Sequence, residues 1–94
     1  MTGEDVEKLI NAISAELEQL GDEPEKMSRR ERKHWAVLRA RKGALERVQE
    51  AIAEGDFSKQ TRASLDYGLL TEYGERNFLL FNFVKSQVGW RLWW

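Results

Sequence analysis

Cysteine is absent from the 94-residue sequence, and proline and histidine each occur only once. Without cysteine the chain can form no disulfide, no thiolate metal site and no cysteine nucleophile. The single histidine, His34, has no second imidazole with which to share a metal ion. We therefore expect neither a metal nor any other cofactor, and the cytoplasm is the predicted compartment.

Long apolar runs are missing too, because no stretch reaches the roughly 18 apolar residues of a membrane span. The first residues are acidic, unlike a secretory signal sequence. Apolar residues make up 41% and charged residues 33%, a mixture typical of a folded, soluble protein. We expect one small domain over 1–94, with a helical hairpin over 3–54, an aromatic segment over 57–94 and no membrane partner.

Sequence motifs of enzymes are missing as well. The chain contains no glycine-rich phosphate loop, no paired-histidine metalloprotease motif and no nucleophile elbow. Serine and aspartate residues near His34 form no triad pattern, and most carboxylates lie in a solvent-rich first helix and linker. We predict that the protein is not an enzyme, has no catalytic residues and takes no small-molecule substrate.

The first predicted helix covers 3–20. Its apolar residues recur at spacings of three and four, which places them on one stripe. Thr2 and Asp5 stand in the register of a capping box at its start, and Gly21 followed by Pro24 provides a stop. The stripe comprises Val6, Leu9, Ile10, Ile13, Leu17 and Leu20.

The second predicted helix covers 28–54, with Ser28 and Glu31 in capping-box register and Gly55 at its end. Its apolar stripe is expected to pack on the first helix as an antiparallel hairpin. The opposite face carries small residues, which suit another helix or a polyanion. The apolar stripe comprises Val37, Leu38, Leu45, Val48 and Ile52; the small face comprises Ala36, Ala40, Gly43 and Ala51.

Two polar residues interrupt the apolar stripe of this second helix. Arg41 is expected to lay its stem along the core and to reach a carboxylate of the first helix, such as Glu16 or Glu18. His34 is expected to be a hydrogen-bonded residue at the edge of the core. Neither residue is assigned a chemical role.

The composition changes after Gly55, since 57–94 holds all four phenylalanines, both tyrosines and three of the four tryptophans. Ser58 is the predicted cap of a third helix that ends at Gly74. An apolar row with a spacing of four residues indicates this helix. It comprises Leu65, Leu69 and Tyr73.

The segment 78–94 fits two structures. A helix is favoured because leucine is common and β-branched residues are few, although such a helix would have apolar residues on nearly every side. A β-hairpin with a turn at 85–87 is the alternative, since apolar residues alternate on both sides of that turn. The fold class is therefore mainly α, with a C-terminal β-hairpin left open.

The aromatic tail carries the favoured prediction of function. A domain of this size needs little large apolar surface near its terminus, and aromatic side chains anchor many interfaces. We predict a non-enzymatic protein–protein interaction or regulatory module that self-associates as a homodimer or other homo-oligomer. The predicted interface residues are Phe78, Phe81, Phe83, Trp90, Trp93 and Trp94.

An uneven distribution of charge supports an alternative function. Residues 1–25 carry eight acidic side chains against Lys8, whereas 29–47 carry eight Arg and Lys against two Glu. The simpler interpretation is that two adjacent helices attract each other along their flanks. The alternative is that the second helix binds nucleic acid through phosphate contacts, although its cations spread around the helix. The residues of this alternative site are Arg29, Arg30, Arg32, Lys33, Arg39 and Lys42.

Overall fold

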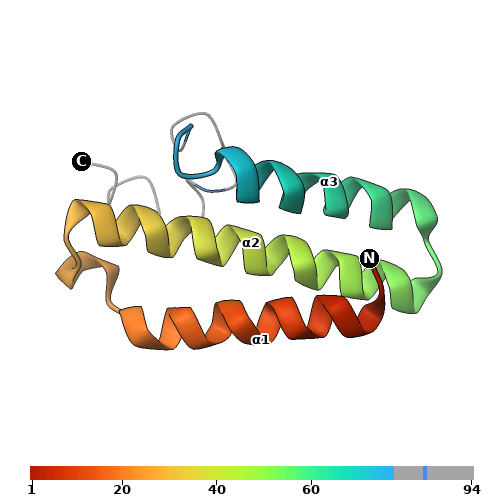
Figure 1. Cartoon of the computed structure of the whole chain (residues 1–94), viewed down its shortest axis with the longest axis horizontal. Coiled ribbons are helices and arrows are strands. Elements are labelled where there is room, and N and C mark those ends of the chain that lie inside the picture. The colour runs from red at the N-terminus through yellow and green to blue at the C-terminus, as the bar shows by residue number, and fades with distance from the viewer. Residues whose placement is uncertain (78–83, 85–94) are drawn as a thin grey trace.

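The structure is a computed structural model that describes residues 1–77 and residue 84. The described chain forms α1 (Gly3–Leu20), the short 3-10 helix η1 (Pro24–Lys26), α2 (Arg29–Glu54) and α3 (Phe57–Tyr73). Consecutive α-helices run antiparallel, and α2 lies between α1 and α3 (Figure 1). The mainly α class and the helical hairpin predicted from the sequence are confirmed.

Helix α1 has the predicted bounds because both of its ends are encoded locally. Asp5 N–H donates to Thr2 Oγ1 at 3.2 Å, and Thr2 N–H donates to Asp5 Oδ2 at 3.4 Å, which completes a capping box. At the other end Gly21 has a φ of 86°, a region that favours glycine, and its N–H donates to the Leu17 carbonyl.

Both ends of helix α2 are also encoded by residues close to them in the sequence. Glu31 N–H donates to Ser28 Oγ at 3.1 Å, and Ser28 N–H donates to Glu31 Oε1 at 3.0 Å. The bond that the Ser28 backbone N–H donates to the Glu31 carboxylate, and after it the nearby Ser28 hydroxyl, lower the pKa of the Glu31 carboxyl. Gly55 ends the helix in the left-handed conformation, with a φ of 71°. Its 26 residues give a rod of about 39 Å.

The cap of helix α3 lies two residues earlier than predicted. The cap is Asp56, whose Oδ1 accepts a bond from Lys59 N–H at 3.0 Å, so the prediction of Ser58 is wrong. Asp56 directly follows the left-handed turn at Gly55, so it is the first residue placed to cap the new helix. The end of α3 at Gly74 is as predicted.

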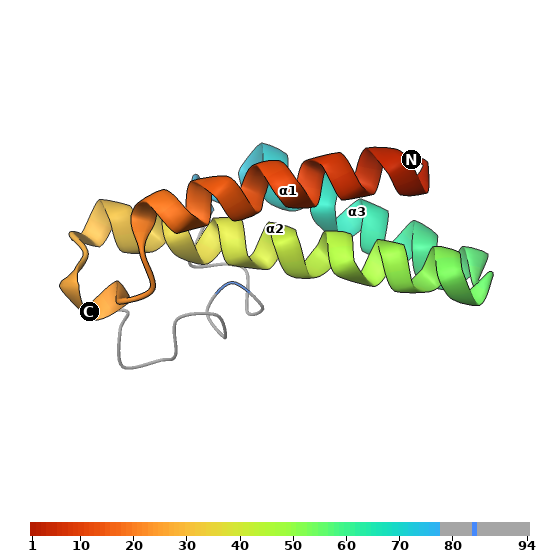
Figure 2. The ribbon, with the colours of Figure 1, turned by 90° about the horizontal axis from the view of Figure 1, so that it is seen from below.

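One half of the core lies mainly between α1 and α2, which run alongside each other (Figure 2), and Ala63 of α3 also reaches it. Leu38 and Leu45 of α2 are buried against α1, as the facing stripes predict, and Ile52 packs at the edge of the same cluster. The buried members of this cluster are Val6, Ile13, Leu38, Leu45, Val48 and Ala63.

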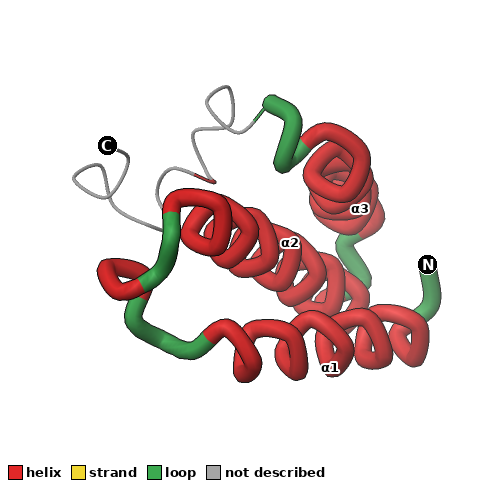
Figure 3. Tube along the Cα trace, turned by 60° about the vertical axis from the view of Figure 1, so that its left-hand side comes forward, coloured by secondary structure: helices red, strands yellow, loops and turns green. Residues whose placement is uncertain are grey.

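The other half of the core fills the side of α2 that faces α3 and residue 84; Figure 3 shows the three helices in this arrangement. Of the small residues predicted to accept another helix or a polyanion, Ala36 and Ala40 are buried in this cluster, so the helix is the correct alternative for them; Ala51 is buried outside the cluster and Gly43 is half-buried. Val37 belongs to this cluster, not to the contact with α1. Its buried members are Trp35, Ala36, Val37, Ala40, Ala44, Leu70 and Val84.

Arg41 fixes the end of α3 instead of reaching a carboxylate of α1. Its Nε and Nη2 donate to the Leu70 carbonyl at 3.3 and 3.2 Å, and Nη2 also donates to the Thr71 carbonyl at 3.3 Å. The Leu70 carbonyl also accepts the Gly74 N–H at 3.0 Å, and the last carbonyls of a helix carry the negative end of its dipole, which attracts the guanidinium. The predicted partners Glu16 and Glu18 are therefore wrong, because the end of α3 offers a better acceptor.

Candidate functional site

The candidate site is a row of side chains on the side of α3 that faces away from α2. It comprises Phe57, Thr61, Leu65, Leu69 and Tyr73, which follow one another at intervals of four residues and so form one ridge. We call this row the α3 outer face. Its apolar members have large exposed fractions: 79% for Phe57, 59% for Leu65 and 40% for Leu69.

The opposite side of α3 makes the contact with α2. Ala63 and Leu70 are 3% and 0% exposed, and Tyr67 packs at the edges of both core clusters. Because these residues already bind α3 to the rest of the fold, the outer face is not needed for that contact. Helix α3 therefore has apolar residues on two sides, and the described core uses one of them.

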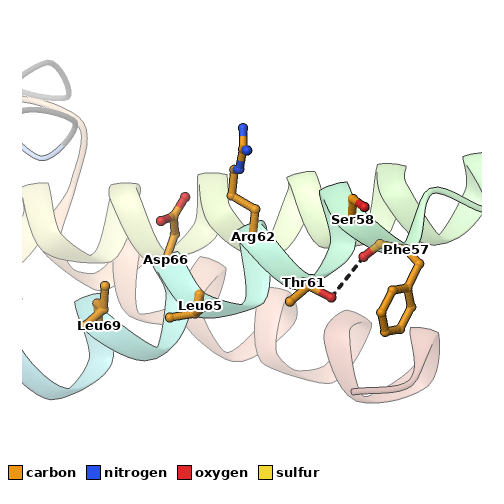
Figure 4. Close-up of a pocket in the computed structure, with 7 residues that line it drawn as sticks. All are labelled: Phe57, Ser58, Thr61, Arg62, Leu65, Asp66 and Leu69. Carbon is orange, nitrogen blue, oxygen red and sulfur yellow. Dashed lines mark hydrogen bonds between the residues drawn. The ribbon is translucent and has the colours of Figure 1, made fainter.

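Figure 4 shows how the side chains around the outer face lie. They border an open hollow on the surface of α3, with Arg62 and Asp66 rising together from one flank of the row. Thr61 Oγ1 donates to the Phe57 carbonyl at 3.0 Å, so its hydroxyl is satisfied inside the helix. The hollow is lined by Phe57, Ser58, Thr61, Arg62, Leu65, Asp66 and Leu69.

The six cations of the predicted nucleic-acid site do not gather on one face of α2. Arg29 and Lys42, for example, point about 140° apart around the helix. Arg39 stacks over the Trp35 ring with its guanidinium carbon 5.5 Å from the ring centroid. Arg39 and Lys42 also line a hollow shared with two carboxylates of the α1 end, Glu18 and Asp22, so acidic groups already lie beside them.

His34 lies between two carboxylates, in agreement with its predicted place at the core edge. Its Nε2 is 3.6 Å from Glu16 Oε2 on α1, and its Nδ1 pairs with the Glu75 carboxylate just after α3. The His34 side chain is 40% exposed, so this contact ties three elements together at a solvated site. Within 1–77 and residue 84, no group of three or more metal-ligating side chains is arranged to hold a metal ion.

Comparison with known proteins gives no relative. The chain matches no protein-family model, no curated protein and no solved structure. Across the part of the chain that the structure describes, no helix has both the length and the apolar content to cross a membrane. The functional argument therefore depends on the chain's own residues.

The predicted interface residues at positions 78, 81, 83, 90, 93 and 94 lie outside the described residues, as does the choice between helix and β-hairpin there. The α3 outer face was not predicted as a site. Its signal was nevertheless present, since Leu65, Leu69 and Tyr73 form one apolar row while Ala63 and Leu70 form another. Two apolar rows on one helix mean that only one of them can face a single neighbouring helix.

Proposed function

We propose that this protein is a non-enzymatic protein–protein interaction module that associates with a second copy of itself. The observation that carries the proposal is the α3 outer face, where Phe57, Leu65 and Leu69 are all exposed along one ridge. Single exposed leucines are ordinary, but apolar side chains that follow one another along a helix form a patch of the kind that partners cover.

The environment of this patch supports a protein partner over a small molecule. The hollow is open to solvent, and its mostly apolar lining includes the polar side chains of Ser58, Arg62 and Asp66. Small-molecule sites are enclosed, whereas an apolar centre with a polar rim is typical of a protein interface.

Nucleic acid is the weaker alternative. Phosphate binding needs several cations that can contact one backbone together. On α2, Arg41 is engaged with the end of α3, and Arg39 and Lys42 have the carboxylates of Glu18 and Asp22 beside them.

Light scattering over a concentration series tests the proposed function. The measured mass of the full chain is expected to be the 11.0 kDa of one copy at low micromolar concentration. It should approach twice that mass at several hundred micromolar. The same samples, mixed with a labelled nucleic-acid duplex at low salt, show whether the protein binds nucleic acid. A mass of one copy at every concentration would contradict the proposal, and salt-sensitive duplex binding by such a monomer would favour the nucleic-acid alternative.

A further inference from the structure

We infer that the second copy docks antiparallel on the α3 outer face, so that Arg62 of each copy meets Asp66 of the other. This inference rests on the proposed function and specifies its interface. It is carried by two patterns on the same helix: the position of the two charges, and the symmetry of the apolar row between Phe57 and Tyr73.

The charges are self-complementary only in one orientation. Arg62 and Asp66 are four residues apart, about 6 Å along the helix, and they lie on the same flank of the row (Figure 4). Within the chain, Asp66 Oδ2 is also 3.9 Å from Arg47 Nη2 of α2, a long and solvated contact that leaves Asp66 able to accept from a partner's arginine. In an antiparallel pair with two-fold symmetry, each flank faces the same flank of the partner in reverse order. Arg62 then opposes the partner's Asp66, and Asp66 opposes the partner's Arg62. A parallel pair brings opposite flanks together and makes neither contact.

The apolar row has nearly the same centre as the charge pair. The row from Phe57 to Tyr73 is centred on Leu65, whereas Arg62 and Asp66 are centred one residue earlier. The two centres therefore differ by about 1.5 Å along the helix. One two-fold axis near Leu65 satisfies both patterns, with Leu65 against its own copy.

The charges and the size of the surface argue for a second copy over other occupants. Arg62 and Asp66 have opposite charges. A strongly acidic partner would therefore be repelled by Asp66, and a strongly basic partner by Arg62. Helix α3 has 17 residues and a length of about 26 Å, which limits the contact to the small end of specific interfaces. The dimer should therefore be in rapid exchange, with a dissociation constant of about 10–100 µM.

Charge reversal on the full chain gives the first test. Arg62→Asp places two acidic residues on the flank, and Asp66→Arg places two basic residues there, so each variant alone should self-associate about tenfold more weakly. An equimolar mixture of the two variants should restore wild-type affinity as a heterodimer, and so should the double variant in one chain. Arg30→Asp, an exposed site at the start of α2, is the matched control and should leave the affinity unchanged.

Single cysteines give the second test, because the natural chain has none. The variants Arg62→Cys and Asp66→Cys are mixed and treated with a short bismaleimide crosslinker. The antiparallel pair predicts that the mixed 62–66 product exceeds the statistical half of all crosslinked dimers. Ala12→Cys, exposed on α1, measures the rate of random collision.

The outcomes separate the inference from the proposed function. A wild-type chain that stays monomeric contradicts both. A wild-type dimer that tolerates both charge reversals, or whose two variants do not complement each other, contradicts the antiparallel α3 interface and leaves self-association standing. A monomer that loses thermal stability on Leu65→Asp would show that the chain covers this face itself, which also overturns the inference. Weakened variants that recover on mixing support it.

Discussion

Helices α1 and α3 both pack against α2, but they distribute their apolar residues differently. On α1, Val6 and Ile13 are buried and Leu9, Ile10 and Leu17 are half-buried, all on the stripe that meets α2. On α3, Ala63 and Leu70 are buried, while the larger surface of Phe57, Leu65 and Leu69 is exposed on the opposite side. The hairpin partner α2 therefore covers the apolar stripe of α1, whereas α3 keeps a second apolar face.

The two sides of α2 explain this difference. Toward α1, α2 presents large side chains such as Leu38 and Leu45, which interlock with a full apolar stripe. Toward α3 it presents Ala36, Ala40 and Ala44, so α3 can pack closely with few large side chains of its own. Helix α3 therefore has leucines that its contact with α2 does not use, and their alignment on the outer face is the reason for proposing a partner there.

The largest expected effect contrasts a buried leucine with an exposed one. Leu45→Ala should lower the free energy of unfolding by about 2–5 kcal/mol, because Leu45 is fully buried and the change leaves a cavity. Leu65→Ala should cost less than about 0.5 kcal/mol in dilute solution, where the chain is monomeric. Urea titration of both variants at about 1 µM measures the contrast, and similar losses would mean that Leu65 is buried.

The next effect concerns the contact that fixes α3. Arg41→Met keeps much of the apolar stem but removes the bonds to the carbonyls of Leu70 and Thr71, so it should destabilise the fold by about 1–2 kcal/mol. Hydrogen exchange should speed up first in the last turn of α3. Arg47→Met, an exposed arginine of the same helix, is the control, with little expected change. Equal effects for both would refute a specific role for Arg41.

A smaller effect is expected at the start of α2. Ser28→Ala removes the oxygen that accepts the Glu31 N–H and should cost about 1 kcal/mol of unfolding free energy. Ser58→Ala on α3 should cost much less, because the structure makes Asp56 the cap there. If Ser58→Ala were the more damaging change in thermal unfolding, the assignment of the α3 cap would be wrong.

The smallest effect is a pH dependence at the same cap. The pKa of Glu31 is lowered in the fold from its ordinary value near 4.5 by the bonds to Ser28. Glu31 therefore stabilises the fold above about pH 4.5, and this stabilisation is lost as the pH falls through the lowered folded value. Glu31→Gln should be less stable than the natural chain at pH 7, with the difference shrinking in acid. A difference independent of pH in paired urea titrations would contradict this account.

Local signals explain how much of the fold was predictable. The bounds of α1 and α2 follow from capping boxes and glycine stops that act within a few residues. The α3 cap was missed because two residues able to cap, Asp56 and Ser58, stand two positions apart. Only the turn at Gly55 decides between them.

Contacts between distant segments explain what was not predictable. Arg41 meets carbonyls 29 and 30 positions away, and His34 pairs with Glu75, 41 positions away. The role of α3 depends in the same way on which of its two apolar rows α2 accepts. Periodicity identifies both apolar rows, but it does not indicate which of them packs against α2.

Sedimentation equilibrium of Leu65→Asp tests the central claim, that one face of α3 builds the fold and the other binds a partner. At a concentration where the natural chain is dimeric, the variant should have the mass of one copy and keep wild-type helical content by circular dichroism. Ala12→Asp, which places the same charge at an exposed site on α1, should remain dimeric. A Leu65→Asp chain that still dimerises, or that loses its helical content, would contradict the claim.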